Sequence, residues 1–156
     1  MSGKLLAIAR REKPRAPMEE IASAAVSVDR GVEGDARGIV EDRHVTVVFR
    51  EDWDAACRDH GVAVPWTARR ANLLVEGLSD FKQVGTCIRV GEVVLEVTEE
   101  NPPCMVMDLQ SPGLRAALQP DWRAGVACNV LRPGAIAIGD RVEVVEKPVP
   151  ARSASI

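Results

Sequence analysis

Apolar residues along this chain fall into short runs rather than long helical stripes. The runs are rich in Val, Ile and Leu and are bounded by Gly, Pro or Asp, a pattern typical of β-strands. Strands are predicted at Leu5–Ile8, Ala24–Val28, His44–Phe49, Ala71–Val75, Cys87–Val90, Val93–Val97, Val126–Leu131 and Arg141–Val145. The pattern therefore predicts a mainly β protein.

Two stretches repeat the same turn chemistry. Gly91-Glu92 and Gly139-Asp140 each place a glycine and an acid between two apolar runs. Glycine at the first turn position is typical of a two-residue hairpin. Both stretches are therefore predicted to be hairpins.

Two short helices interrupt the strand pattern. The segment Glu51–His60 begins with acids, has Trp53 and Ala56 on one face and stops at Gly61. Cys57 and His60 lie on the same face, which favours packing or capping over metal ligation. A second helix is predicted from about Pro112 to Leu118, with Ser111 as its N-cap.

Many short strands with few helices favour a closed or nearly closed β-barrel, because closure removes unpaired strand edges. A β-sandwich is the alternative. With 156 residues, of which 46% are hydrophobic, the chain predicts one domain, placed at residues 1–145. Residues 146–156 lack periodicity and are expected to form a disordered tail.

Charge and hydropathy limit the environment of the protein. The net charge is −3, so no global positive field favours nucleic acid or an anionic membrane. The sequence has no apolar run long enough to span a bilayer and no signal-peptide pattern after Met1. We expect a cytoplasmic protein.

The four cysteines are scattered, and their spacing matches neither a disulfide framework nor a zinc site. Cys104 differs from the others because Pro102 and Pro103 precede it and hold the backbone extended. A thiol displayed there can act as a nucleophile, a sulfur carrier or a soft-metal ligand. The alternative is a small buried hydrophobic residue.

Basic residues gather before two predicted strands. Arg43 and His44 precede one strand, and Arg70 with Asn72 enters another. Such charges are often only solvated strand ends. However, the guanidinium group suits phosphate, so a small phosphorylated cofactor is a second interpretation. The glycine-rich stretch Gly31–Gly38 lacks a P-loop ending and is weak as a nucleotide motif.

The order of these motifs resembles the MOSC domain, the module named for the C-terminal part of molybdenum-cofactor sulfurases. The resemblance covers about residues 4–145. It rests on six segments in order, namely Gly31–Asp35, Arg43–Val47, Arg70–Leu78, Gly85–Gly91, Pro103-Cys104 and Gly134–Asp140. The family has a barrel-like β fold, in agreement with the strand pattern.

The resemblance implies roles for individual residues. The family's functional cysteine, proposed to carry sulfur or ligate molybdenum, corresponds to Cys104, and an Arg-x-Asn motif that holds the phosphate of the cofactor corresponds to Arg70 and Asn72. Candidate cofactor-binding residues of lower rank are Asp35, Arg37, Arg43 and His44, because the sequence departs from the family pattern there. The aminotransferase-like domain of sulfurases is not represented, so pyridoxal phosphate is not expected to bind.

Three functions follow from the resemblance. Cys104 accepts persulfide sulfur from a cysteine desulfurase and passes it on, with a molybdoenzyme as a candidate partner. Alternatively, Cys104 ligates molybdenum within the molybdenum cofactor, which carries the redox chemistry. The third is a non-catalytic barrel that carries cofactor or contacts a partner enzyme. The sequence leaves open whether the chain is an enzyme; a catalytic form would be a sulfur transferase or a molybdenum-dependent protein.

Overall fold

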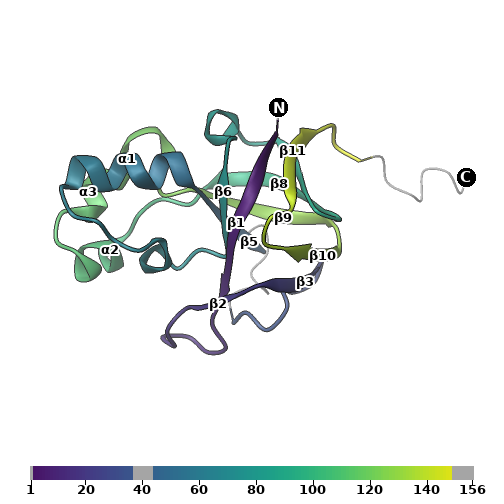
Figure 1. The fold of residues 1–156 in the computed structure, drawn as a ribbon, viewed down its shortest axis with the longest axis horizontal. Coiled ribbons are helices and arrows are strands. Elements are labelled where there is room, and N and C mark those ends of the chain that lie inside the picture. Colours follow the sequence, from purple (N-terminus) through teal and green to yellow (C-terminus); the bar gives the residue numbers. More distant parts are fainter. Residues whose placement is uncertain (1, 37–43, 149–156) are drawn as a thin grey trace, which may run out of the picture.

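The strands of the protein close into a barrel (Figure 1). The computed structural model describes residues 2–36 and 44–148, and within them seven strands form the ring β11-β7-β8-β9-β5-β6-β1, with β1 pairing again to β11. Their bounds are β1 (Ser2–Arg10), β5 (Val45–Phe49), β6 (Leu73–Glu76), β7 (Cys87–Val90), β8 (Val93–Glu100), β9 (Val126–Arg132) and β11 (Arg141–Val145). The prediction of a mainly β fold with a closed barrel is confirmed.

A smaller sheet lies beside one end of the barrel (Figure 1). It has the order β10-β3-β4, formed by Gly134–Ala137, Ser23–Ser27 and Gly31–Val32, and β2 (Glu19–Ile21) extends the main sheet from β1. The sequence pattern predicted neither β2 nor β4, because these strands are very short and carry no apolar run of strand length. It gave no separate strand bounds for β10, which falls in the apolar run before the turn at Gly139-Asp140.

One predicted hairpin is confirmed and the other is wrong. Gly91-Glu92 joins β7 to β8, with Val90 paired to Val93 across a two-residue turn. The strands on either side of Gly139-Asp140 do not pair with each other, because β10 pairs with β3 while β11 pairs with β1 and β7. The N–H of Gly139 instead donates to the carbonyl of Leu5 at 2.8 Å, so this turn crosses between the two sheets.

The helices lie together on one side of the barrel (Figure 1). They are α1 (Arg50–His60), α2 (Met105–Gln110) and α3 (Leu114–Leu118), with short 3-10 turns η1 (Trp66–Arg69), η2 (Ser79–Phe81) and η3 (Pro120–Trp122). The first helix ends at Gly61, as predicted, and the structure shows Gly61 in a left-handed conformation. None of the described helices combines the length and apolarity needed to cross a lipid bilayer.

The second predicted helix is partly wrong. Ser111 does not cap its N-terminus but ends α2, and α3 begins only after Gly113, which has a left-handed φ of 97°. The helix α2 was missed because Pro102 and Pro103 indicate extended chain. The two prolines do keep the backbone extended up to Cys104, but a helix begins at the next residue, Met105.

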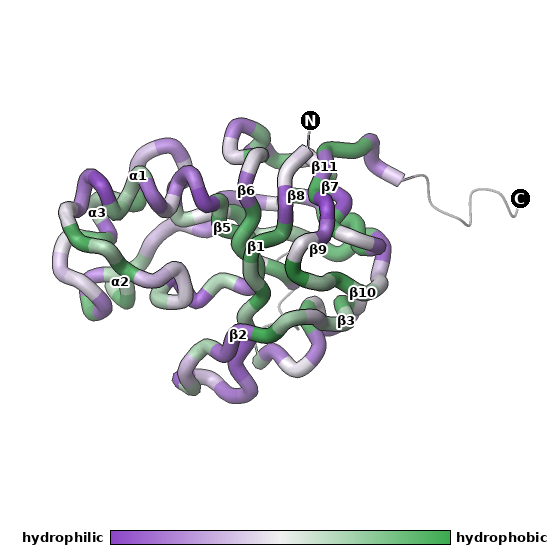
Figure 2. The backbone as a smooth tube through the Cα atoms, in the orientation of Figure 1, coloured by the Kyte–Doolittle hydropathy of each residue, from purple (hydrophilic) through white to green (hydrophobic). Residues whose placement is uncertain are grey.

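Two apolar cores support this arrangement. One fills the barrel, and the other lies between the barrel wall and the helices. Along β5, Val47 belongs to the barrel core and Val48 to the helical core, because alternate strand residues face opposite sides. Figure 2 shows the resulting hydrophobic strands at the centre of the molecule. Since β5 and β6 are a parallel pair joined through α1, burial of both their faces is expected.

The predicted tail at 146–156 falls mainly outside the described residues, since residues 149–156 are not described. Before that point, the Nζ of Lys147 lies 3.3 Å from a carboxylate oxygen of Glu96 on β8. This part of the predicted tail therefore contacts the barrel.

Candidate functional site

Cys104 lies where the chain leaves β8 and enters α2. The linker Asn101–Pro103 is followed by Cys104 in an extended conformation, with φ −125° and ψ −179°, as the N-cap residue of α2. Its carbonyl accepts a hydrogen bond from the N–H of Met107 at 2.9 Å. The backbone of Cys104 is thus fixed by the first helical turn, while the residue itself is exposed.

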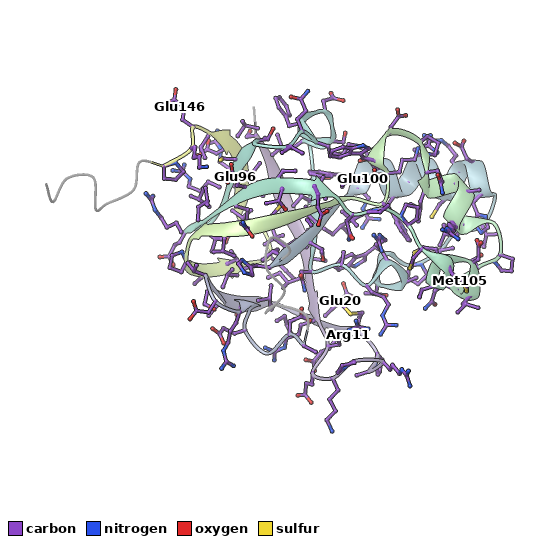
Figure 3. All side chains as sticks on the ribbon, turned by 180° about the vertical axis from the view of Figure 1, so that it is seen from behind. Arg11, Glu20, Glu96, Glu100, Met105 and Glu146 are labelled. Carbon is purple, nitrogen blue, oxygen red and sulfur yellow. The ribbon has the colours of Figure 1, made fainter. Side chains whose placement is uncertain are left out.

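The thiol opens onto a cleft of about 660 Å³. Among the described residues, its charged lining consists of arginines from two segments, the loop after β1 and the end of η1. We call it the arginine cleft; its lining is Arg11, Pro14, Arg15, Arg69, Arg70, Asn101, Pro102, Pro103, Cys104, Val106 and Met107. In Figure 3, the labelled Arg11 and Met105 mark the loop and the helix α2 that border it. This local positive charge contrasts with the overall charge of −3.

The other cysteines occupy different environments. Cys87 and Cys128 are buried, and Cys57 is partly buried with its Sγ 3.8 Å from the carbonyl oxygen of Val64. Burial raises the pKa of Cys128 far above its ordinary value and also raises the pKa of Cys87. Both thiols are therefore held in the protonated, unreactive form.

Arg70 reaches the cleft through an unusual backbone conformation. It follows η1 with φ 67°, in the left-handed region that bulky residues rarely adopt. Its Nη2 donates to the carbonyl of Ala16 at 3.2 Å, which ties it to the loop carrying Arg15. Arg15 also has a left-handed φ, of 71°. Two such arginines at one cleft are the kind of local strain that gathers at functional sites.

Arg69, the neighbour of Arg70, points inward. It is 5% exposed, and its Nε donates to the carbonyl of Ala124 at 2.8 Å. Its Nη2 donates to the carbonyls of Asn101 at 2.7 Å and Pro102 at 3.4 Å. Arg69 therefore connects the end of η1 to the linker that carries Cys104.

Asn72 lies before the strand that it was predicted to enter, and it does not extend into the cleft beside Arg70. The strand β6 begins only at Leu73, after the left-handed turn at Arg70. Asn72 is 4% exposed; its Oδ1 accepts a hydrogen bond from the backbone N–H of Thr46 at 3.1 Å, and its Nδ2 donates to the carbonyl of Ala9 at 3.2 Å. These contacts join three strand segments, and Asn72 is not among the residues described as lining the cleft.

Of the lower-ranked candidates, Asp35 contacts a cleft residue, His44 is not among the lining residues, and two lie outside the described residues. Asp35 supports the cleft loop, because its Oδ1 accepts the backbone N–H of Arg11 at 3.1 Å. His44 stands one residue before β5, with a buried Nδ1 that has no hydrogen-bond partner among the described residues. Arg37 and Arg43 lie outside the described residues.

The sequence analysis missed Arg11, Arg15 and Arg69. For Arg11 and Arg15 a usable pattern was present, because both belong to a basic run after the first predicted strand. That run consists of Arg10, Arg11, Lys13 and Arg15. No local pattern separates Arg69 from Arg70. Their different directions follow from the backbone turn at Arg70, which appears only in the structure.

The described residues contain no cluster of side chains that could hold a metal ion by themselves. Nowhere in residues 2–36 and 44–148 do three His, Cys, Asp or Glu side chains gather closely enough to hold an ion. A metal at Cys104 would need to bring its other ligands with it. That condition describes a metal carried within an organic cofactor.

Several solved structures share the fold of this chain. The YuaD protein from Bacillus subtilis is similar with a TM-score of 0.79 and 22% identity, over 95% of this chain and 98% of that one. YiiM from Escherichia coli gives 0.69 and 18%, over 94% and 72% of the two chains. YiiM from Geobacillus stearothermophilus gives 0.68 and 20%, over 96% and 76%. At these identities the likeness shows the fold.

The sequence itself matches one family. No curated protein matches the chain. The MOSC domain, however, matches residues 33–143, well over half of the sequence, and that range includes both Cys104 and the Arg69-Arg70 pair. The earlier resemblance is confirmed: this chain belongs to the MOSC domain family, which is generally associated with the molybdenum cofactor.

Proposed function

We propose that this domain binds the phosphorylated pterin of the molybdenum cofactor in the arginine cleft and presents Cys104 to it as a sulfur carrier. The observation that carries this proposal is the exposed Cys104 thiol at the edge of a cleft whose described charged residues are all arginines. An anion and a soft sulfur or metal centre are the partners that such a pair of groups favours.

The residues fit the cofactor in three respects. Arg11, Arg15 and Arg70 offer planar donor forks suited to a phosphate group. The volume of the cleft lies within the range of roughly 300–1,000 Å³ usual for small-molecule sites. The cofactor also brings its own ligands to molybdenum, which this chain does not assemble in its described part. When bound, the cofactor supplies the metal-centred chemistry.

The chain's own chemistry centres on one exchange at Cys104. The thiolate of Cys104 attacks the outer sulfur of a persulfide on a cysteine desulfurase. The sulfur–sulfur bond of the donor breaks, the donor leaves as a thiolate, and Cys104 keeps the transferred sulfur as a persulfide. A second nucleophile then attacks that outer sulfur and restores the Cys104 thiolate. The exposure of Cys104 allows a protein donor to approach, which burial of Cys87 and Cys128 forbids.

The proposal is tested on protein purified without oxygen. Mass spectrometry of the intact protein and its peptides reports persulfide on each cysteine, and elemental analysis reports molybdenum. We expect persulfide on Cys104, lost in Cys104→Ser and retained in the control Cys57→Ser. Molybdenum that disappears with Cys104→Ser would instead assign that residue as a metal ligand. If neither persulfide nor molybdenum is found after exposure to a desulfurase and the cofactor, the remaining interpretation is a non-catalytic binding module.

A further inference from the structure

We propose that Arg69 is a positioning residue that fixes Cys104 in relation to the arginine cleft. The functional meaning of this role rests on the proposed function of Cys104, although the structural part can be measured without any cofactor. Arg69 acts through the linker before Cys104, because its guanidinium donates to the carbonyls of Asn101 and Pro102.

The burial of Arg69 shows that these bonds are needed. A cation that is 5% exposed must be surrounded by hydrogen-bond acceptors. The backbone carbonyls of Asn101, Pro102 and Ala124 are three such acceptors for Arg69. The fork geometry matters here, since one planar group reaches carbonyls on two separate chain segments. A lysine has a single nitrogen and cannot replace both Nε and Nη2.

The linker has a second anchor, which makes the position of Cys104 dependent on both. The N–H of Asn101 donates to the carbonyl of Gly125 at 3.0 Å, beside the Ala124 carbonyl that Arg69 also holds. The two prolines that follow have a restricted φ and cannot donate from their backbone nitrogens. Arg69 and Gly125 therefore hold the start of the linker, and the prolines transmit that position to Cys104.

The adjacent arginines have different tasks in this scheme. The left-handed φ of Arg70 turns its side chain toward the Ala16 carbonyl and the cleft, while Arg69 reaches inward. One arginine is thus available to a ligand and the other secures the thiol. Because the two residues are adjacent, the arginine proposed to bind the anion and the arginine that positions the Cys104 thiol are directly connected.

The test compares Arg69→Met and Arg69→Lys with the wild type. Lys82→Met is the matched control, because Lys82 is also a cation with little exposure, its side chain being 9% exposed, and it donates to the backbone carbonyl of Asp121 in a different hollow. Hydrogen exchange of the Asn101 and Met107 amides reports the order of the linker and of the first turn of α2. The rate at which iodoacetamide labels Cys104, with and without pyrophosphate as a probe anion, reports the relation of the thiol to the cleft.

We expect the two amides to exchange about tenfold faster or more in Arg69→Met, with partial rescue in Arg69→Lys and no such change in Lys82→Met. We also expect pyrophosphate to slow labelling in the wild type and to lose this effect in Arg69→Met. Exchange at the two amides that changes no more in Arg69→Met than in Lys82→Met would overturn the proposal. If the amides respond but pyrophosphate never protects Cys104, the positioning role stands and the proposed anion site fails.

Discussion

The barrel interior and the face that carries the arginine cleft use the same residue types for opposite purposes. Cys128 pairs with Val97 across β9 and β8 and is buried in the barrel core, whereas Cys104 follows the end of β8 and is exposed. Arginine shows a related contrast within the cleft lining itself, since Arg69 is buried against backbone carbonyls whereas the next residue, Arg70, is less buried. Residue type therefore does not determine the role of a side chain here; its burial and the backbone conformation that directs it do.

The largest expected contrast is in thiol reactivity. Cys104 should react with iodoacetamide about 10³-fold faster than Cys128, or more, because Cys128 becomes accessible only when the core opens, at a cost of several kcal/mol. Peptide mass spectrometry after timed labelling of the folded protein measures both rates. Labelling of Cys87 or Cys128 before Cys104 would show that the cleft is not the reactive region.

Substitutions in the barrel core and on the face that carries the arginine cleft should also differ in their effect on the free energy of unfolding. Leu95 is 1% exposed in the barrel core, so Leu95→Ala is expected to lower the free energy of unfolding by about 2–5 kcal/mol. Leu109 on α2 is 76% exposed, and Leu109→Ala should change it by less than about 0.5 kcal/mol. Urea unfolding measures both. Similar losses in the two variants would mean that α2 belongs to the cooperative core.

The same contrast explains which features could be predicted from sequence. Short apolar runs bounded by turn residues indicate strands, so the bounds of β7 and β11 were predicted as the structure has them. The turn at Gly139-Asp140 has the chemistry of the hairpin at Gly91-Glu92, yet the partner of β10 is the distant β3. Local chemistry specifies a turn, but long-range pairing decides which strands meet.

The cleft was only partly predictable for a related reason. Cys104 was found because two prolines before a thiol are a local feature. Arg69 was not found, because its role depends on carbonyls more than thirty residues away, at Asn101 and Ala124. The direction of Arg70 depends on a positive φ that is not apparent from its residue type.

Two substitutions at Arg70 should distinguish the contribution of its guanidinium to ligand binding from the energetic cost of its left-handed backbone. Arg70→Gly and Arg70→Ala both remove the guanidinium, and each should weaken binding of molybdopterin about tenfold or more, as expected for a lost charge-assisted contact. Only glycine adopts φ 67° without a steric penalty, so Arg70→Gly should be more stable than Arg70→Ala by about 1 kcal/mol.

Calorimetric titration and urea unfolding measure these two effects separately. Unchanged binding in Arg70→Ala would mean that Arg70 serves only the loop, through its bond to Ala16. Equal stability of the glycine and alanine variants would mean that the left-handed turn relaxes when the guanidinium is lost.

The smallest expected effect concerns a second charged hollow, in which one lysine lies among three aspartates. Lys82 donates to Asp52 at 2.6 Å, in a hollow also lined by Asp80 and Asp121. Burial raises the pKa of Asp52 above its ordinary value of 3.8, although the hydrogen bond and charge of Lys82 oppose this. The folded state therefore binds this proton more tightly than the unfolded state does. The resulting stabilisation is complete below pH 3.8 and is lost as pH rises through the pKa of the folded state.

Lys82→Met removes the opposing contribution, so it should raise the pKa of Asp52 further and increase the loss of stability toward neutral pH. NMR titration of the Asp52 carboxyl carbon measures the pKa, and urea unfolding at acid and neutral pH measures the stability. A pKa in the variant at or below the wild-type value would show that Lys82 does not offset the burial of Asp52. The arginine cleft differs from this hollow, because the charged residues of its described lining are arginines and none is an acid.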